Sequence, residues 1–146
     1  MFLLIMILEV NWDNLIINDD FIVPISRKIK KTKKKLIIEN DLYGVEGPCP
    51  PGIYYIFYRL RESGDRLELC QEKPKELFTF NHEQGILFSE KGTKRTNIQI
   101  HLGTKSKGCI LISKKHKDLY WKLLKLVSEK LNKKEIIKIK VDDYWK

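Results

Sequence analysis

Cysteine and histidine are scarce in this sequence, which contains only three of each. The cysteines, Cys49, Cys70 and Cys109, are far apart, and no two of them form a Cys-x-x-Cys pair. We therefore expect no disulfide framework, because such frameworks stabilise shorter secreted chains. We also expect no structural zinc, since the histidines lack the spacing of zinc ligands. An odd number of cysteines in a reducing environment, with at least one free thiol, is the simpler interpretation.

Long apolar runs are also missing. The one candidate, residues 1–8, is too short to cross a bilayer. It has no positively charged region before it and no small-residue cleavage site after it, so it does not match a signal peptide. The run predicts a buried first strand. We expect cytoplasmic synthesis without ordinary secretion, and no membrane span.

Acidic residues are outnumbered by basic ones, 19 to 28, which leaves a formal net charge of +9. This excess favours anionic partners, whether nucleic acid, an anionic glycopolymer or a membrane surface. The densest basic run covers residues 27–35 and continues into the apolar residues 36–38. No recognition-helix pattern or RNA-binding aromatic signature accompanies it. We interpret the run as a hairpin or exposed edge strand whose lysines prevent aggregation, and nucleic-acid binding as possible but not favoured.

Most of the chain shows the patterns of strands. Alternating or β-branched apolar segments predict strands at residues 1–10, 53–60, 66–70, 77–80, 86–88, 97–101 and 135–141. Helical spacing of leucines predicts one long helix over residues 114–132, with Ser113 as its N-cap. No repeat or linker divides the chain. We predict a mainly β (α+β) fold, a β-sandwich of mixed sheets with one packed carboxy-terminal helix, as a single domain over residues 1–146.

The most informative segment is residues 97–112, Asn-Ile-Gln-Ile-His-Leu-Gly-Thr-Lys-Ser-Lys-Gly-Cys-Ile-Leu-Ile. It places His101 at the end of a strand, on the polar face, and Cys109 after a short polar loop. A thiol at a glycine-containing bend and a neighbouring imidazole are the parts of a cysteine nucleophile and its base. The basic residues Lys105 and Lys107 add a cationic field that favours the thiolate. In the alternative interpretation, Cys109 is a small buried hydrophobic residue and His101 an ordinary residue at a strand end.

Two motifs in this order resemble the L,D-transpeptidase (YkuD-like) catalytic domain. The first is Pro50-Pro51-Gly52-Ile-Tyr-Tyr-Ile56, and the second joins Ile100-His101-x-Gly103 to Ser106-x-Gly108-Cys109-Ile110. The resemblance is closest to small stand-alone relatives carried by phages and mobile elements. It covers residues 48–141, including the helix and the strand that end the domain.

The resemblance implies acyl transfer on a peptidoglycan stem peptide, with no metal and no organic cofactor. Cys109 would attack an amide carbonyl after His101 has taken its proton, and a thioester would form and then be resolved by an amine or by water. The implied supporting groups are the backbone N–H groups near Gly108 and Cys109 as oxyanion donors, and the carbonyl of Leu102 or Gly103 as the group that orients the histidine. The residues expected to contact the stem peptide, or another anionic glycopolymer, are Lys105, Ser106 and Lys107.

Three departures from the family pattern bear on activity. Leu111 stands where cell-wall enzymes of the family usually carry Arg or Asn, Lys107 stands where histidine is frequent, and the loop before Cys109 is short. Two other functions therefore stay open. One is a non-catalytic descendant that binds a glycopeptide or a protein, and the other is a basic nucleic-acid-binding domain. The route to the cell wall also stays open: phage lysis, delivery by a secretion machine and a purely cytosolic role are the alternatives.

Overall fold

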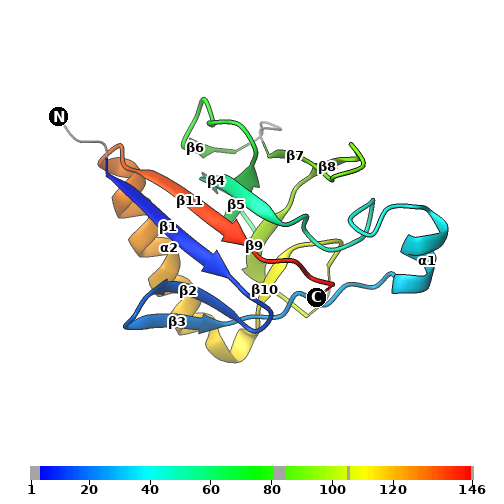
Figure 1. Ribbon diagram of the computed structural model, residues 1–146. Coiled ribbons are helices and arrows are strands. Elements are labelled where there is room, and N and C mark those ends of the chain that lie inside the picture. Colours follow the sequence, from blue (N-terminus) through cyan, green and yellow to red (C-terminus); the bar gives the residue numbers. More distant parts are fainter. Residues whose placement is uncertain (1–3, 81–84, 105, 146) are drawn as a thin grey trace.

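The computed structural model describes residues 4–80, 85–104 and 106–145, and strands dominate it (Figure 1). The mainly β fold class, with mixed sheets and one packed carboxy-terminal helix, is confirmed. The strands are β1 (Ile5–Val10), β2 (Asn14–Asn18), β3 (Phe21–Pro24), β4 (Gly52–Arg59), β5 (Arg66–Cys70), β6 (Phe78–Thr79), β7 (Ile86–Phe88), β8 (Lys94–Thr96), β9 (Gln99–Leu102), β10 (Ile110–Ile112) and β11 (Ile136–Val141). The helical segments are α1 (Lys33–Ile38), the 3₁₀ turn η1 (Lys114–His116) and α2 (Lys117–Asn132).

Nine strands form the main sheet, in the order β10-β9-β5-β4-β11-β1-β2-β3, with β6 pairing beside β4. The pairs β9–β10 and β1–β11 are parallel, whereas β4 pairs antiparallel with both β5 and β11. β7 and β8 form a separate hairpin. Beyond β3, Ser26 exchanges two backbone hydrogen bonds of 2.8 Å with Leu111 of β10. Because β3 and β10 are the two edges of the main sheet, this bridge nearly closes it.

The main core lies between the concave side of the sheet and α2, which runs along one side of it (Figure 1). Alternate residues of the central strands supply aliphatic side chains to this core, and the apolar face of α2 covers them. Fully buried members include Ile56, Leu69, Ile100, Ile110, Leu123 and Val127. The intervening residues of the same strands, such as Glu68, Gln99 and Cys109, lie on the other face. This second face carries the candidate site.

The expected long helix is present as the turn η1 followed by α2, and the Ser113 side chain accepts a hydrogen bond from the N–H of Lys115. The first predicted strand is shorter than expected, since β1 begins at Ile5 and residues 1–3 lie outside the described part of the chain. The strand predicted over 97–101 begins two residues later, as β9 from Gln99, because Asn97 adopts a left-handed conformation (φ 56°) between β8 and β9. Asparagine tolerates that conformation better than most residues.

The prediction of a hairpin or edge strand over the basic run was wrong. Its last three residues form the start of α1, which begins after Thr32, whose side chain accepts a hydrogen bond from the N–H of Lys35. Lysine and leucine are good helix formers, and Leu36 is fully buried, so capping and one buried side chain outweigh the β-branched Ile37 and Ile38. In Figure 1, α1 lies at the end of the molecule away from α2.

Candidate functional site

The strand register brings Cys109 and His101 onto one face of two neighbouring strands. In the parallel pair β9–β10, Ile100 stands opposite Ile110 and His101 opposite Leu111. One step earlier, Cys109 stands beside Gln99, whose backbone N–H donates a hydrogen bond of 3.3 Å to the Cys109 sulfur. The Cα atoms of Cys109 and His101 are then diagonal neighbours, roughly 8 Å apart from strand spacing and residue rise. The two side chains therefore leave the same face of the sheet from neighbouring segments of the chain.

His101 is held in one tautomer by the residue that follows it. Its Nδ1 lies 2.7 Å from the carbonyl oxygen of Leu102, so Nδ1 carries the proton and donates it to that carbonyl. This leaves Nε2 without a proton and able to accept one. Burial lowers the pKa of His101 below its ordinary value, and the positive charges of Arg66 and Arg61 lower it further. The imidazole is therefore neutral at pH 7, the state that a general base requires.

Cys109 is the most exposed of the three cysteines, at 9% against 1% for Cys49 and for Cys70. Burial raises the pKa of its thiol above the ordinary value, although Gln99, Arg66 and Ser106 act in the opposite direction. The sequence-based expectation that cationic surroundings depress this pKa is therefore wrong, because desolvation outweighs them. Burial raises the pKa of both Cys49 and Cys70 to about 12.

In this arrangement the thiol and the imidazole lie on one face of the sheet, and each is bonded to a different partner. The Cys109 thiol donates to the carbonyl oxygen of Asn97, at 3.4 Å, instead of to His101. In the resting state the thiol and the imidazole are both neutral. The thiol must leave the carbonyl oxygen of Asn97 before its proton can pass to Nε2, and catalytic hydrogen bonds are often long in unliganded proteins.

The loop before Cys109 is organised by Ser106, whose hydroxyl accepts a hydrogen bond of 2.8 Å from the Cys109 N–H. That N–H was expected to donate to an oxyanion, and in this arrangement it is already engaged. Lys107 is exposed and pairs with Glu46 at 3.1 Å. Lys105 lies outside the described residues. Gly103 lies beside the imidazole, because a Cβ atom there would be 3.5 Å from Cε1 of His101.

Arg95 is the residue of this region that sequence reasoning missed. Its guanidinium is buried and donates to four carbonyl oxygens, at 2.7–2.9 Å, those of Tyr43, Gly47, Pro48 and Lys107. It thereby ties the proline-rich turn before β4 to the loop that carries Cys109. Gly108 (φ 112°) must be glycine, because a Cβ atom there would be 2.6 Å from Nη2 of Arg95 and 2.7 Å from the carbonyl oxygen of Gly47. A lone arginine in a short strand offers no sequence signal for such a role.

A chain of hydrogen bonds continues from the candidate site across the same face of the sheet. Arg59 binds Glu68 through two bonds, at 3.0 and 2.7 Å, and Glu68 accepts a third from Nε2 of Gln99 at 2.6 Å. Oε1 of Gln99 in turn accepts a bond of 2.8 Å from Nη1 of Arg66. We call Arg59, Glu68, Gln99 and Arg66 the polar network. It carries two arginines for one carboxylate, so it has a surplus of positive charge.

The position two residues after Cys109 is occupied by Leu111, whose side chain has no polar group to bind a ligand. Leu111 is fully buried and pairs on both sides, with His101 of β9 and with Ser26. A side chain at that position cannot touch a substrate without opening the sheet edge.

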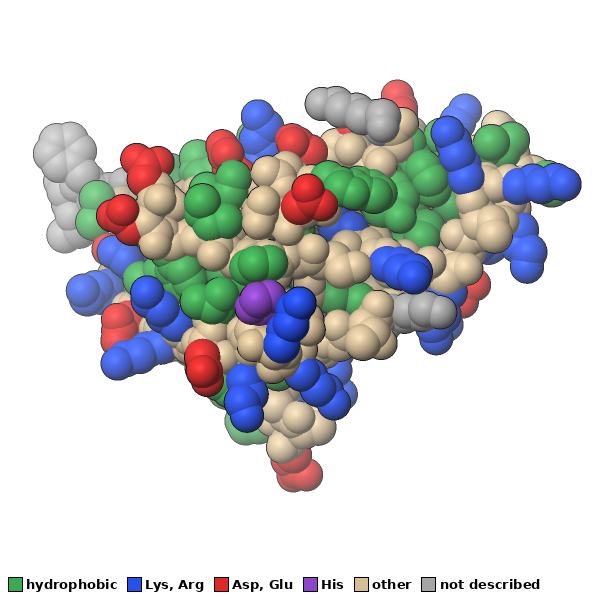
Figure 2. Space-filling view, turned by 90° about the horizontal axis from the view of Figure 1, so that it is seen from below, with side chains coloured by type: hydrophobic (Ala, Val, Ile, Leu, Met, Phe, Trp, Pro, Cys, Tyr) green, Lys and Arg blue, Asp and Glu red, His purple; other side chains and the backbone are tan. Residues whose placement is uncertain are grey.

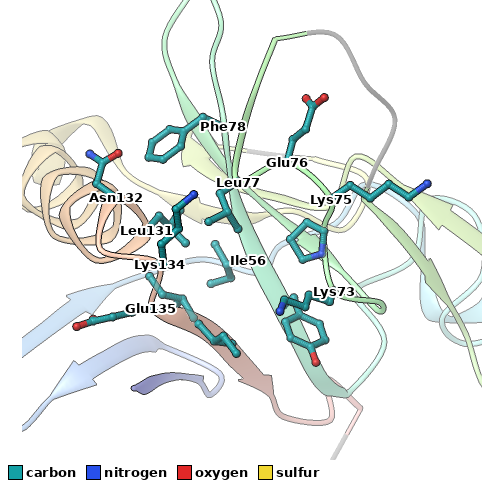
Figure 3. A pocket seen from close by; sticks show the side chains of 14 residues that line it. Ile56, Lys73, Lys75, Glu76, Leu77, Phe78, Leu131, Asn132, Lys134 and Glu135 are labelled. Carbon is teal, nitrogen blue, oxygen red and sulfur yellow. The ribbon is translucent and has the colours of Figure 1, made fainter. Parts of the chain in front are cut away.

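One hollow of the surface lies near these residues, and a larger one lies elsewhere. A hollow of about 340 Å³ adjoins Gly103, between the end of β3 and the start of η1. A larger cleft of about 510 Å³ lies elsewhere, between the β6 region and the end of α2, where Ile56, Leu77, Phe78 and Leu131 lie at its apolar wall (Figure 3). This second cleft does not include Cys109 or His101.

The basic run does not form a continuous free stripe. Arg27 is buried, at 4% exposure, and lies 5.5 Å from the ring of Tyr144, whereas Lys31 pairs with Glu39 at 2.6 Å. On the face seen in Figure 2, Lys and Arg side chains occupy several separate parts of the surface, with acidic side chains between them. On this face the positive charge is therefore distributed.

Within the described ranges, no group of three His, Cys, Asp or Glu residues is arranged to hold a metal ion. None of the helices in that part of the chain combines the length and the apolar character needed to cross a bilayer. In the comparisons with known proteins, no family model matches the sequence, and no curated protein or solved structure is significantly similar to it. The resemblance to L,D-transpeptidases rests on the motif residues alone.

Proposed function

We propose that this protein is a cysteine-dependent acyltransferase or hydrolase of the L,D-transpeptidase or L,D-carboxypeptidase type, acting on peptidoglycan stem peptides. The observation that supports the proposal is the placement of Cys109 and His101 on one face of the sheet, together with the bond between Nδ1 of His101 and the carbonyl oxygen of Leu102. A neutral imidazole with a free Nε2 beside a thiol is the minimum apparatus for thioester chemistry without a cofactor.

In the proposed reaction, Nε2 of His101 removes the thiol proton of Cys109, and the sulfur attacks the carbonyl carbon of an amide in the stem peptide. The tetrahedral intermediate collapses by breaking the C–N bond, and the imidazolium returns its proton to the departing amino group of a terminal D-amino acid. An amine or a water molecule then attacks the thioester and gives up a proton to Nε2, and the thiol is regenerated. The high resting pKa of Cys109 supports transfer of the proton to histidine during attack in place of a standing thiolate.

The test is incubation of the protein with purified muropeptides, with mass spectrometry used to detect D-alanine release, D-amino-acid exchange and an acyl-enzyme on Cys109. We expect the acyl-enzyme in the wild type and in neither Cys109→Ser nor His101→Ala. Cys49→Ser serves as the matched control and should retain activity. Equal behaviour of wild type and Cys109→Ser, with no acyl-enzyme mass, would refute the enzymatic proposal.

A second candidate function is a non-catalytic binding module for a glycopeptide. The raised pKa of Cys109 and the engagement of its N–H by Ser106 favour this candidate, because a binding protein needs neither a thiolate nor a free oxyanion donor. It predicts saturable binding of muropeptides, measured by calorimetry, that Cys109→Ser leaves unchanged and that is accompanied by no product.

A further inference from the structure

Within the described residues, Arg66 is a cation of the candidate site that has no carboxylate partner and whose side chain makes one hydrogen bond, unlike Arg95, which donates to four carbonyl oxygens. Both oxygens of Glu68, the carboxylate of the polar network, are occupied by the fork of Arg59. Arg66 is half-buried, and within the described residues it forms no ion pair; its side chain donates to the neutral amide of Gln99. A half-buried guanidinium without a carboxylate partner has donors to offer to an anion.

Arg66 is also rigidly placed relative to the nucleophile. In the antiparallel pair β5–β9, Glu68 stands opposite Gln99, so Arg66 stands beside His101 on the same face. Gln99 links Arg66 to Cys109, because its backbone N–H binds the sulfur while its side-chain oxygen holds Nη1 of Arg66. The orientation of the Gln99 amide is set in turn by its bond to Glu68. The electrostatics agree, since the charge of Arg66 lowers the pKa of both Cys109 and His101.

We propose that Arg66 is a specificity-determining residue that binds a carboxylate of the substrate close to the carbonyl attacked by Cys109. Arg61, whose charge also acts on His101, strengthens the local positive field. This inference rests on the proposed function and deepens it, because it restricts the substrates to acyl donors with a free carboxylate near the scissile bond. We assign carboxylate binding to Arg66 because Leu111 is buried and Lys107 is paired with Glu46.

Thiol alkylation tests the inference without an enzymatic assay. Iodoacetate and iodoacetamide both react with the thiolate of Cys109 by displacing iodide, and they differ in that iodoacetate carries a carboxylate. The ratio of their rate constants at Cys109 therefore cancels the thiolate fraction and reports the attraction of the site for a carboxylate. Site-resolved peptide mass spectrometry gives the rate at Cys109 separately from those at Cys49 and Cys70.

We expect the ratio at Cys109 to exceed that of a free thiol in the same buffer and to fall as ionic strength rises. Arg66→Met should lower it about fivefold, the size expected for one pair of unit charges in contact in water. Arg66→Lys should recover part of the loss, because it keeps the charge but not the planar fork. Lys107→Met, which removes the same charge from the neighbouring loop, should leave the ratio unchanged.

An unchanged ratio in Arg66→Met, an equal fall in Lys107→Met, or no reaction of Cys109 with either reagent would overturn the inference. If Arg66→Met does not fold, the wild-type protein still tests the inference. A ratio of iodoacetate to iodoacetamide rate constants at Cys109 that is no higher than that of a free thiol at low ionic strength would also overturn it. Failure of the proposed function looks different, because no acyl-enzyme would form with muropeptides while the alkylation ratio still depended on Arg66.

Discussion

At the scale of single residues, this protein separates two kinds of buried polar group on one face of its main sheet. Arg95 and Glu68 are fully engaged by fixed partners and hold the backbone and the neighbouring strands. Cys109, His101 and Arg66 are partly engaged and retain donors or acceptors for a ligand. Buried polar groups are costly unless they are bonded, so the partly engaged set is where function is to be sought.

The first prediction concerns the reactivity of the three thiols. Cys109 should react fastest with iodoacetamide at pH 7, because it is the most exposed and the pKa values of the other two thiols are raised to about 12. His101→Ala should slow the reaction at Cys109, since a neutral imidazole is the nearby base. The acid limb of the wild-type rate should lie below pH 6.5, because burial lowers the pKa of His101. Alkylation rates followed from pH 5 to 9 for each cysteine check this, and equal rates at all three would contradict it.

The second prediction concerns the ion pair between Arg59 and Glu68, in which both side chains are buried. Arg59→Met should lower the free energy of unfolding by about 3–5 kcal/mol, because it leaves a buried carboxylate without its partner. The double variant Arg59→Met/Glu68→Leu should be more stable than the single variant, since it removes the stranded charge. Urea denaturation of the four proteins of this cycle measures both effects. A double variant less stable than Arg59→Met would show that the pair is not the source of the loss.

At the scale of elements, the loop between β9 and β10 is shaped by contacts with a segment far away in sequence. Residues 44–52 supply the carbonyl oxygens of Gly47 and Pro48 that Arg95 binds, and Arg95 in turn binds the carbonyl oxygen of Lys107 in the loop. The short loop before Cys109 is therefore held in place at the end of the sheet. Its glycine, Gly108, is required by packing as well as by its φ angle.

The third prediction follows from that packing. Gly108→Ala should lower the free energy of unfolding by about 2–4 kcal/mol, because it adds a clash with Arg95 to the strain of a positive φ. Gly64→Ala is the matched control, since Gly64 has a φ of 124° and no atom within 4 Å of an added Cβ. Gly64→Ala should lower the free energy of unfolding only by the backbone strain, about 1–2 kcal/mol. Chemical denaturation of both variants measures the difference, and equal losses would mean that the contact with Arg95 is unimportant.

At the scale of the whole molecule, the bridge between Ser26 and Leu111 joins the amino-terminal hairpin to the edge strand that follows Cys109. The start of the basic run thus borders the candidate site, as Ile29 also bridges to Ser106. The net charge of +9 belongs to the surface as a whole, with some of its cations paired. Such a distribution attracts anionic polymers over a distance without specifying a sequence.

The fourth prediction concerns the exposed lysines of α1. Replacing Lys33, Lys34 and Lys35 by glutamine should change the free energy of unfolding by less than about 1 kcal/mol, because the contact of Lys33 with the ring of Trp145 is the main one lost. Binding to DNA or RNA should be weak, should weaken further in this variant and should disappear as salt rises. Fluorescence anisotropy at low and physiological salt checks this. A tight, sequence-selective complex at physiological salt would favour the nucleic-acid-binding alternative.

The sequence by itself determined the class of fold and the location of most elements, because period-two alternation and leucine spacing are local signals. Arg66–Cys70 was predicted to the residue, and the long helix to within its 3₁₀ start. The sequence also identified His101 and Cys109 as candidate site residues, from their spacing around Gly103 and Gly108. The helix α1 was missed, since a cap at Thr32 and the burial of Leu36 decided between two local patterns.

Only the tertiary structure decided how the candidate site is assembled. The parallel register of β9 and β10 places Cys109 and His101 on one face, and the register of β5 adds Arg66 from more than thirty positions away. Burial then sets the sign of the Cys109 pKa shift, which the neighbouring lysines in the sequence indicated wrongly. These properties depend on which distant strands become neighbours and on how much water they exclude. Neither quantity is a property of a local segment, so neither can be obtained from a motif.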